Sequence, residues 1–248
     1  MICIRVNFYR VRAGVDIKTS LGRFFILGLY DLTMKSYLSE FIGTAMLLAI
    51  VAGSGIMGEA LGSGNAAVAL LGNSIATGAG LYALITLLGP ISGAHFNPVV
   101  TLMFWNLGQL DLRKMLGYCF CQFSGALCGI WLTHLMFSLP IIQESTKLRA
   151  GLGIWVSEFV STLVLLSVIH MGDKEAKDRV SMLVALTVTA GYWFTSSTFF
   201  ANPAVALARS FTNTFVGIAP NNVLGFVVAE VLAALVMIGI FSFSKQKS

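Results

Sequence analysis

The sequence predicts an all-α membrane protein with six transmembrane helices and two short re-entrant half-helices, arranged as an inverted internal repeat. Composition is the first reason: 56% of the 248 residues are hydrophobic and only 11% are charged, whereas soluble domains carry about 25% charged residues. The second is a pair of Asn-Pro dipeptides, Asn97-Pro98 and Asn202-Pro203, each followed by small apolar residues. The third is that the segments around these dipeptides recur in the same order in both halves of the chain.

The N-terminal region is unlike the rest of the chain. Residues 1–34 are basic, contain no small-residue cleavage site, and have apolar stretches too short to cross a bilayer. We expect 1–34 to be an extension outside the fold, with Met34 as an alternative start; a cytoplasmic amphipathic arm is the other interpretation. The predicted membrane domain covers 35–243, with repeat one at about 35–137 and repeat two at about 153–243, and 244–248 form a cytoplasmic tail.

Long apolar runs predict the six spans. They lie at about 37–57, 66–88, 115–137, 153–171, 180–198 and 221–243. Each half has an odd number of spans, so the two halves insert in opposite directions and form an inverted repeat. Most lysines and arginines flank the spans on one side, which the positive-inside rule assigns to the cytoplasm. We therefore expect a multi-pass protein of the cell (inner) membrane with both termini in the cytoplasm.

Each Asn-Pro dipeptide predicts the start of a half-helix. Asn is a strong N-cap and Pro is favoured at the first helical position, so Pro98-Val99 and Pro203-Ala204 are expected to open helices of roughly 15 Å, half of a hydrocarbon core. Two such N-termini near the midplane each place about half a positive charge there, which repels cations. The side-chain NH2 groups of Asn97 and Asn202 can donate to a passing water, and its fixed orientation interrupts a proton wire.

Matched carboxylates accompany the half-helices. Glu40 and Glu158 lie near the start of the first span of each half. Gln122 in the first half and Glu230 in the second half also occupy matching positions. Intramembrane carboxylates are functional candidates by default, and one interpretation is a proton relay in a coupled transporter. Their matched positions favour another, in which they accept hydrogen bonds from the non-helical backbone before each half-helix. His95 is expected to anchor the first of these loops or to face the inner vestibule.

Other functional classes find little support in the sequence. His134 and His170 lie near span ends and are expected at the membrane interface. Three of the four cysteines fall in one apolar segment, and no grouping of His, Cys and carboxylates has the spacing of a metal or nucleophile site. Basic residues are confined to segment ends, so no nucleic-acid partner is expected. We predict no cofactor, no metal and no enzymatic activity.

Two segments carry a specific resemblance to a known family. From Ser92 to Thr101 and from Ala201 to Ala204 the sequence resembles the aquaporins, the major intrinsic protein family, and the resemblance extends over about 35–243. It implies a homotetramer with a pore through each protomer and passive flux of water or small neutral solutes across the lipid bilayer. The sequence departs from the family at Val99, where Ala is usual, and at Val205, where the family generally has Arg.

The resemblance also implies a selectivity constriction. Counted from the two Asn residues, its positions are Thr77, Ala190 or Gly191, Phe199 and Val205. This small-sided, uncharged ring resembles that of wide, aquaglyceroporin-like bacterial members, so the expected solutes are water, polyols, urea, ammonia and neutral metalloid hydroxides such as arsenous acid. Arg209, one turn beyond Val205, is expected in the outer vestibule or bound to backbone carbonyls or lipid headgroups. A coupled secondary transporter of a small anion or weak acid and a structural membrane protein with a closed pore remain as alternatives.

Overall fold

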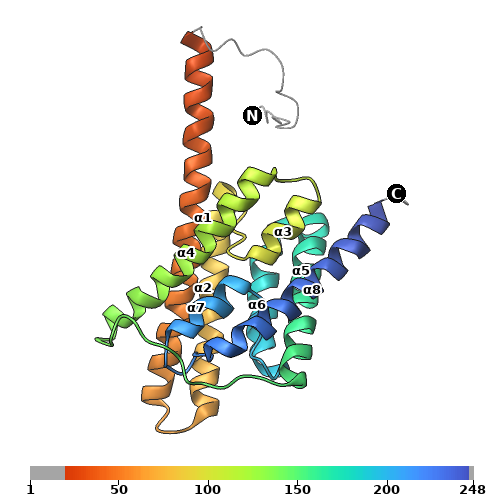
Figure 1. Ribbon diagram of the computed structural model, residues 1–248. Coiled ribbons are helices and arrows are strands. Elements are labelled where there is room, and N and C mark those ends of the chain that lie inside the picture. The colour runs from red at the N-terminus through yellow and green to blue at the C-terminus, as the bar shows by residue number, and fades with distance from the viewer. Residues whose placement is uncertain (1–19, 246–248) are drawn as a thin grey trace.

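The computed structural model describes the backbone of residues 20–245 and the side chains of residues 33–242. Figure 1 shows a bundle of helices, and no strand occurs in the described part of the chain. The long helices are α1 (Ser20–Leu61), α2 (Ala66–Ser92), α4 (Leu112–Met136), α5 (Leu152–Glu175), α6 (Val180–Phe194) and α8 (Pro220–Lys245). Two short helices, α3 (Pro98–Asn106) and α7 (Pro203–Ala208), and two 3₁₀ turns, η1 (Lys177–Arg179) and η2 (Arg209–Phe211), complete the described elements. The predicted all-α fold with two half-helices is confirmed.

The six long helices correspond to the six predicted spans, with one difference in length. Five of them contain a segment long and apolar enough to cross a membrane. The sixth, α6, has 15 residues, about 22 Å at 1.5 Å per residue, and it ends at Phe194 rather than at the predicted 198. Thr195 has extended backbone, with φ −114° and ψ 140°, so the chain leaves the helix one turn early and continues as non-helical backbone toward α7.

The first helix is longer than the predicted span. α1 begins at Ser20 and continues without interruption into the apolar segment Thr33–Leu61, and Figure 1 shows its N-terminal part extending beyond the bundle. Residues 1–19 lie outside the described part of the chain. The boundary at residue 34 therefore stays a prediction, although the residues just before it are helical and continuous with the first span.

The two halves of the chain pack in the same pattern. α1 packs against α2 and α4, α5 packs against α6 and α8, and contact between α2 and α6 joins the halves. Each half-helix contacts the last helix of both halves, because α3 and α7 both lie against α4 and α8. The close approach of α1 and α4 requires glycine: a Cβ on Gly125 or Gly129 would lie 2.4 or 2.2 Å from the carbonyl oxygens of Phe41 and Ala45. This packing holds both half-helices between the two halves.

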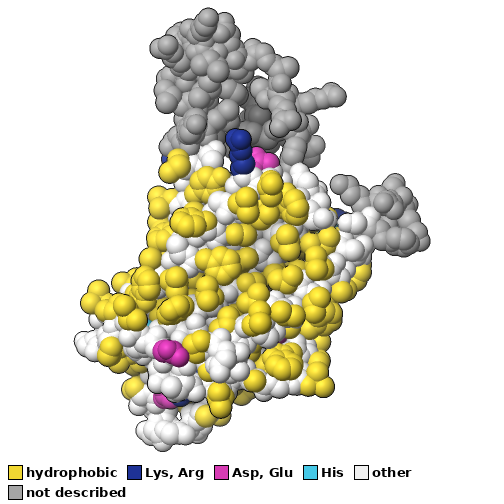
Figure 2. All heavy atoms as spheres, in the orientation of Figure 1, with side chains coloured by type: hydrophobic (Ala, Val, Ile, Leu, Met, Phe, Trp, Pro, Cys, Tyr) yellow, Lys and Arg dark blue, Asp and Glu magenta, His cyan; other side chains and the backbone are white. Residues whose placement is uncertain are grey.

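Apolar side chains cover the outside of the bundle, while polar side chains are buried within it. Figure 2 shows hydrophobic side chains spread over the visible face, with few charged ones among them. Inside, the side chains of Glu40, Gln122, Glu158 and Glu230 are all 0% exposed. Polar groups that face the interior and an apolar exterior are what a bilayer requires of a spanning bundle. The fold is that of a multi-pass membrane protein.

Candidate functional site

The two half-helices begin where the Asn-Pro dipeptides predict. Oδ1 of Asn97 accepts a hydrogen bond from the backbone N–H of Val99 at 3.0 Å. Oδ1 of Asn202 accepts from the N–H groups of Ala204 at 3.0 Å and Val205 at 3.4 Å. A proline follows each Asn at the first helical position, where no backbone donor is lost. Both half-helices therefore begin with the capping contacts that their local sequence predicts.

The two asparagines also bond to each other's loops. Nδ2 of Asn97 donates to the carbonyl oxygen of Ala201 at 2.7 Å, and Nδ2 of Asn202 donates to the carbonyl oxygen of Phe96 at 2.8 Å. Phe96 and Ala201 each directly precede an Asn, and both have left-handed backbone, with φ of 49° and 46°. One N–H of each amide is thus bound to the opposite loop, and the second N–H of each amide has no hydrogen-bond acceptor among residues 33–242.

Buried carboxylates hold the non-helical backbone before each half-helix. Oε1 of Glu40 accepts from Ser92 Oγ at 2.7 Å and from the N–H of His95 at 3.0 Å. Its Oε2 accepts from the N–H of Phe96 and from Gln122 Nε2, both at 2.8 Å. These bonds match the interpretation of Glu40 as a hydrogen-bond acceptor for the loop.

The second half repeats this arrangement with two carboxylates. Glu158 accepts from the N–H groups of Phe200 at 3.0 Å and Ala201 at 2.8 Å. Glu230 accepts from the N–H of Asn202 at 2.9 Å. The matched residues of the repeat therefore lie at matched places in the fold, each beside the loop of its own half-helix.

The three histidines differ in their surroundings. His95 Nδ1 lies 3.0 Å from Thr101 Oγ1, and this side chain also lines a cavity between the two halves of the bundle. His134 lies in the last turn of α4, and its side chain is 0% exposed. Its Nδ1 lies 2.7 Å from the carbonyl oxygen of Ile141 and its Nε2 lies 2.8 Å from Thr212 Oγ1, so loop segments cover it. His170 stacks on Phe241 with 3.7 Å between ring centroids.

A cavity of about 780 Å³ lies between the halves and is lined by both Asn97 and Asn202. Charged side chains line it at both ends of the bundle. Lys114 and Asp173 do so near the start of α4 and the end of α5, and Arg209 does so just after α7. The two half-helix N-termini therefore meet on the wall of one cavity.

Three of the four predicted constriction residues line this cavity, and one does not. Thr77, Phe199 and Val205 contribute to the wall. Ala190 is not among the lining residues, and its side chain is exposed on the outside of α6. Gly191, the stated alternative, is buried against the Phe199 ring, where a Cβ would lie 2.2 Å from Cδ2.

α6 turns other residues toward the cavity. Val184, Val188 and Tyr192, four residues apart and so on one helical face, line it. The hydroxyl of Tyr192 lies 3.1 Å from Thr77 Oγ1, which joins α6 to α2 across the wall. Sequence reasoning missed Tyr192 because counting back from Asn202 crosses non-helical backbone, where helical periodicity does not apply. The periodicity of α6 itself was the available signal.

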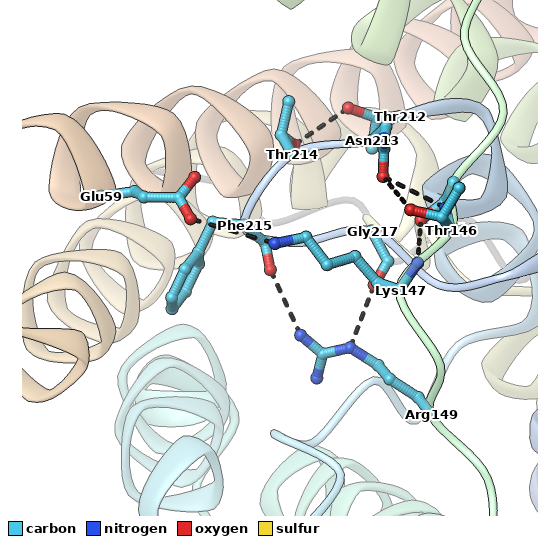
Figure 3. A network of polar contacts seen from close by, with 10 residues as sticks. Glu59, Thr146, Lys147, Arg149, Thr212, Asn213, Thr214, Phe215 and Gly217 are labelled. Carbon is cyan, nitrogen blue, oxygen red and sulfur yellow. Dashed lines mark hydrogen bonds and ion pairs between the residues drawn. The ribbon is translucent and has the colours of Figure 1, made fainter. Parts of the chain in front are cut away.

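The 137–151 loop and the segment after α7 interlock at one end of the cavity. Figure 3 shows Thr146 bonded to Asn213, whose Oδ1 accepts from the N–H and the Oγ1 of Thr146, both at 3.1 Å. Lys147 Nζ lies 4.0 Å from Glu59 Oε1, and Arg149 donates to two backbone carbonyls of the segment. Sequence reasoning gave Arg149 no role.

The chain matches the model of a known family and is similar in sequence to several known proteins. The family model described as "Major intrinsic protein" matches residues 30–241. The chain is 49% identical over 217 residues to the aquaglyceroporin AqpS of Rhizobium meliloti (strain 1021), covering 88% of this chain and 92% of that protein. It is 32% identical over 170 residues to a probable glycerol uptake facilitator protein of Thermotoga maritima, covering 61% of this chain and 70% of that protein.

A solved structure supports the same fold. The X-ray structure of the aquaglyceroporin from Plasmodium falciparum superposes with a TM-score of 0.65 at 19% identity, covering 84% of this chain and 95% of that one. At this identity the likeness shows the fold alone. The family match over most of the chain, together with 49% identity to a relative over nearly its whole length, decides the family. This chain is a member of the major intrinsic protein family.

Proposed function

We propose that the chain forms a passive transmembrane channel for water and small neutral solutes: polyols such as glycerol, urea, and neutral metalloid hydroxides such as arsenous acid. The observation that carries the proposal is the pair of Asn-headed half-helices on the wall of one 780 Å³ cavity. The names of the two relatives, an aquaglyceroporin and a probable glycerol uptake facilitator, support water and glycerol-type solutes.

Exclusion of ions follows from the electrostatics of the junction. Each half-helix N-terminus is equivalent to about half a positive charge, so a cation between them is repelled as well as dehydrated. The free N–H of each Asn amide donates to the oxygen of a passing water. That water cannot donate back to these groups, which interrupts a proton wire.

The wall of the cavity favours solutes with one polar and one apolar side. Hydroxyls of Thr77 and Tyr192 lie 3.1 Å apart and can exchange hydrogen bonds with a solute hydroxyl. Phe199 and Val205 line the cavity with apolar side chains. Glycerol presents hydroxyls on one side and C–H groups on the other, so it can satisfy both kinds of surface. Water can use the hydroxyls alone.

Passive flux is favoured over coupled transport by the state of the carboxylates. Glu40 has both oxygens bound to the loop before α3, and Glu158 has both bound to the loop before α7. Protonation would break bonds that hold the half-helices, which opposes a proton relay. We further infer a homotetramer in the cell (inner) membrane with both termini in the cytoplasm, and the broad apolar exterior supports bilayer and subunit contacts.

The test is permeability of the full chain reconstituted in liposomes. Osmotic light scattering should show uptake of water, glycerol, urea and arsenous acid above empty liposomes, independent of pH gradient and membrane potential. Flux that requires a pH gradient or a potential would support the coupled transporter instead. A folded protein that conducts none of the four solutes would support a structural role with a closed pore.

A further inference from the structure

The second half of the repeat buries two acids where the first half buries one acid and one amide. Gln122 and Glu230 occupy matching positions in the two halves, as do Glu40 and Glu158, and all four side chains are 0% exposed. In the first half, Nε2 of Gln122 donates to Oε2 of Glu40 at 2.8 Å. The residue on the last helix of that half therefore supplies a hydrogen-bond donor to the acid on its first helix.

Glu230 lies where it can supply a donor to Glu158 in the same way. α5, which carries Glu158, packs against α8, which carries Glu230, and the two carboxyl groups lie within hydrogen-bonding reach of each other. A carboxylate has no donor, whereas a protonated carboxyl group has one O–H donor. Two adjacent buried carboxylates repel each other strongly, because no water screens their charges. The contact therefore requires a proton on one of the two groups.

The hydrogen bonds assign the negative charge to Glu158. Its two oxygens accept from the backbone N–H groups of Phe200 at 3.0 Å and Ala201 at 2.8 Å. The hydroxyl of Ser197 also lies within hydrogen-bonding reach of this carboxyl group. Donors directed at both oxygens favour the ionised form of a carboxyl group.

The charged groups around the pair favour the same assignment. Arg149, from the 137–151 loop, and Arg209, just after α7, both interact electrostatically with Glu158, and a positive charge favours the ionised form of a nearby acid. The charge that acts on Glu230 is instead the negative charge of Glu158, which favours a neutral Glu230. α3 and α7, which also pack against α8, contain no titratable residue.

Glu230 has an oxygen that can carry the proton. Its Oε1 accepts from the N–H of Asn202 at 2.9 Å, and no N–H group or hydroxyl among residues 33–242 donates to its Oε2. A proton on Oε2 leaves the bond to Asn202 intact and provides an O–H that Glu158 can accept. The joined pair then holds two consecutive backbone N–H groups, those of Ala201 and Asn202, from two different helices.

We propose that Glu158 and Glu230 bind one proton between them, carried on Oε2 of Glu230, and that the start of the second half-helix is held in place only while this proton is bound. When the proton leaves to solvent at alkaline pH, two adjacent anions remain and repel each other, which displaces Ala201 and Asn202. Both carboxyl groups are ionised at neutral pH in the unfolded chain. The folded protein therefore binds one proton more than the unfolded chain, and its stability falls as the pH rises.

Infrared spectroscopy of the full chain detects this proton directly, because the C=O stretch of a protonated carboxyl group is separate from the bands of a carboxylate. At about pH 7 the difference spectrum between the wild type and Glu230→Gln should contain the band of one protonated carboxyl group. This band should disappear between about pH 7 and about pH 10. Glu59→Gln is the matched control: Glu59 is exposed and lies 4.0 Å from Lys147 Nζ, so its difference spectrum should lack the band.

Thermal unfolding and flux test what the proton does. Gln offers the same acceptor and donor as a protonated Glu230, but at every pH. Between about pH 7 and about pH 10, the unfolding midpoint of the wild type should fall by at least about 4 °C more than that of Glu230→Gln. The wild type should also lose glycerol flux over this range, with equal pH on both sides of the liposome, whereas Glu230→Gln should keep its own. Gln122→Glu creates a second acid pair beside Glu40 and should add a second infrared band.

Several results would overturn the proposal. Absence of the band at about pH 7, or its persistence at about pH 10, would do so. Failure of Glu230→Gln to fold would do so as well, because Gln can make both hydrogen bonds, and so would midpoints that change in parallel or a wild-type flux that stays constant as the band disappears. The flux measurement rests on the channel function proposed above. A wild type with the expected band and midpoints that conducts no glycerol at any pH would overturn that function and leave the shared proton standing.

Discussion

Replacement of Glu40 by Gln tests how the first half-helix is held. Glu40 is 0% exposed and its two oxygens accept four hydrogen bonds. Gln offers one acceptor oxygen and one NH2 group, so two of the four donors would face another donor. If the NH2 group faces Gln122 and the N–H of Phe96, the Gln122 amide can flip so that its oxygen, which has no partner among residues 33–242, accepts. The Phe96 N–H is then left unpaired in the most favourable arrangement.

The magnitude follows from that one lost partner. A buried donor left without a partner costs about 1–3 kcal/mol. In a chain of this length each kcal/mol shifts the unfolding midpoint by about 2–4 °C, so Glu40→Gln should lower it by about 2–12 °C. The flux of glycerol should fall as well, because the loop that Glu40 holds leads directly to Asn97.

Glu230→Gln is the matched control. Oε1 of Glu230 accepts from the N–H of Asn202 at 2.9 Å, and the Glu230 carboxyl group also lies within hydrogen-bonding reach of the Glu158 carboxyl group, to which the NH2 group of Gln could donate. The amide oxygen of Gln can take the place of Oε1, so no accepted bond is lost and the midpoint should change by less than about 2 °C. The assay is thermal unfolding in detergent at one scan rate, followed by tryptophan fluorescence. Equal shifts for the two variants, or a larger shift for Glu230→Gln, would refute this reasoning.

Three other substitutions or deletions test the channel itself. Asn202→Asp places a carboxylate between the half-helix N-termini and removes the donor to Phe96. Na⁺ currents in planar bilayers should therefore exceed those of the wild type. Background currents from a folded, water-permeable variant would contradict the dipole explanation. Val205→Arg adds a bulky cation, so glycerol and arsenous acid flux should fall about tenfold more than water flux. An equal loss of flux for all solutes would mean that the narrowest point of the pore lies elsewhere. Deletion of 1–33 should leave flux unchanged, whereas loss of membrane insertion would show that the extension is required.

The parts of the site that sequence predicted are those encoded locally and repeated. Asn97 and Asn202 are N-caps because an Asn before Pro has that chemistry in any context, and the repeat doubled the signal. Glu40 and Glu158 were assigned to the loops because their positions matched in the two halves. Both assignments depend on order along the chain, which the sequence displays directly.

The parts that sequence missed depend on contacts between distant segments. Ala190 was placed in the constriction by counting across backbone that turned out not to be helical, and α6 ends four residues earlier than expected. The burial of His134 depends on the chain folding back over it through Ile141 and Thr212. The role of Arg149 depends on a hydrogen bond to a residue 68 positions away, which no local pattern indicates.

The hydrogen bonds between the two loops link stability to selectivity. Phe96 and Ala201 have left-handed backbone, a conformation that costs a non-glycine residue about 1 kcal/mol or more. Their N–H groups donate to Glu40 and Glu158 respectively, which holds them in that conformation.

The carbonyl groups of the same two residues accept from the amides of Asn202 and Asn97. Each carboxylate therefore orients the carbonyl that fixes the Asn of the opposite half-helix. The donor offered to a solute by one half thus depends on the buried acid of the other half. Replacement of either acid should therefore change the position of both Asn amides and lower the flux of solute. The hydrogen bonds between the carboxylates and the backbone thus stabilise the arrangement of both Asn side chains.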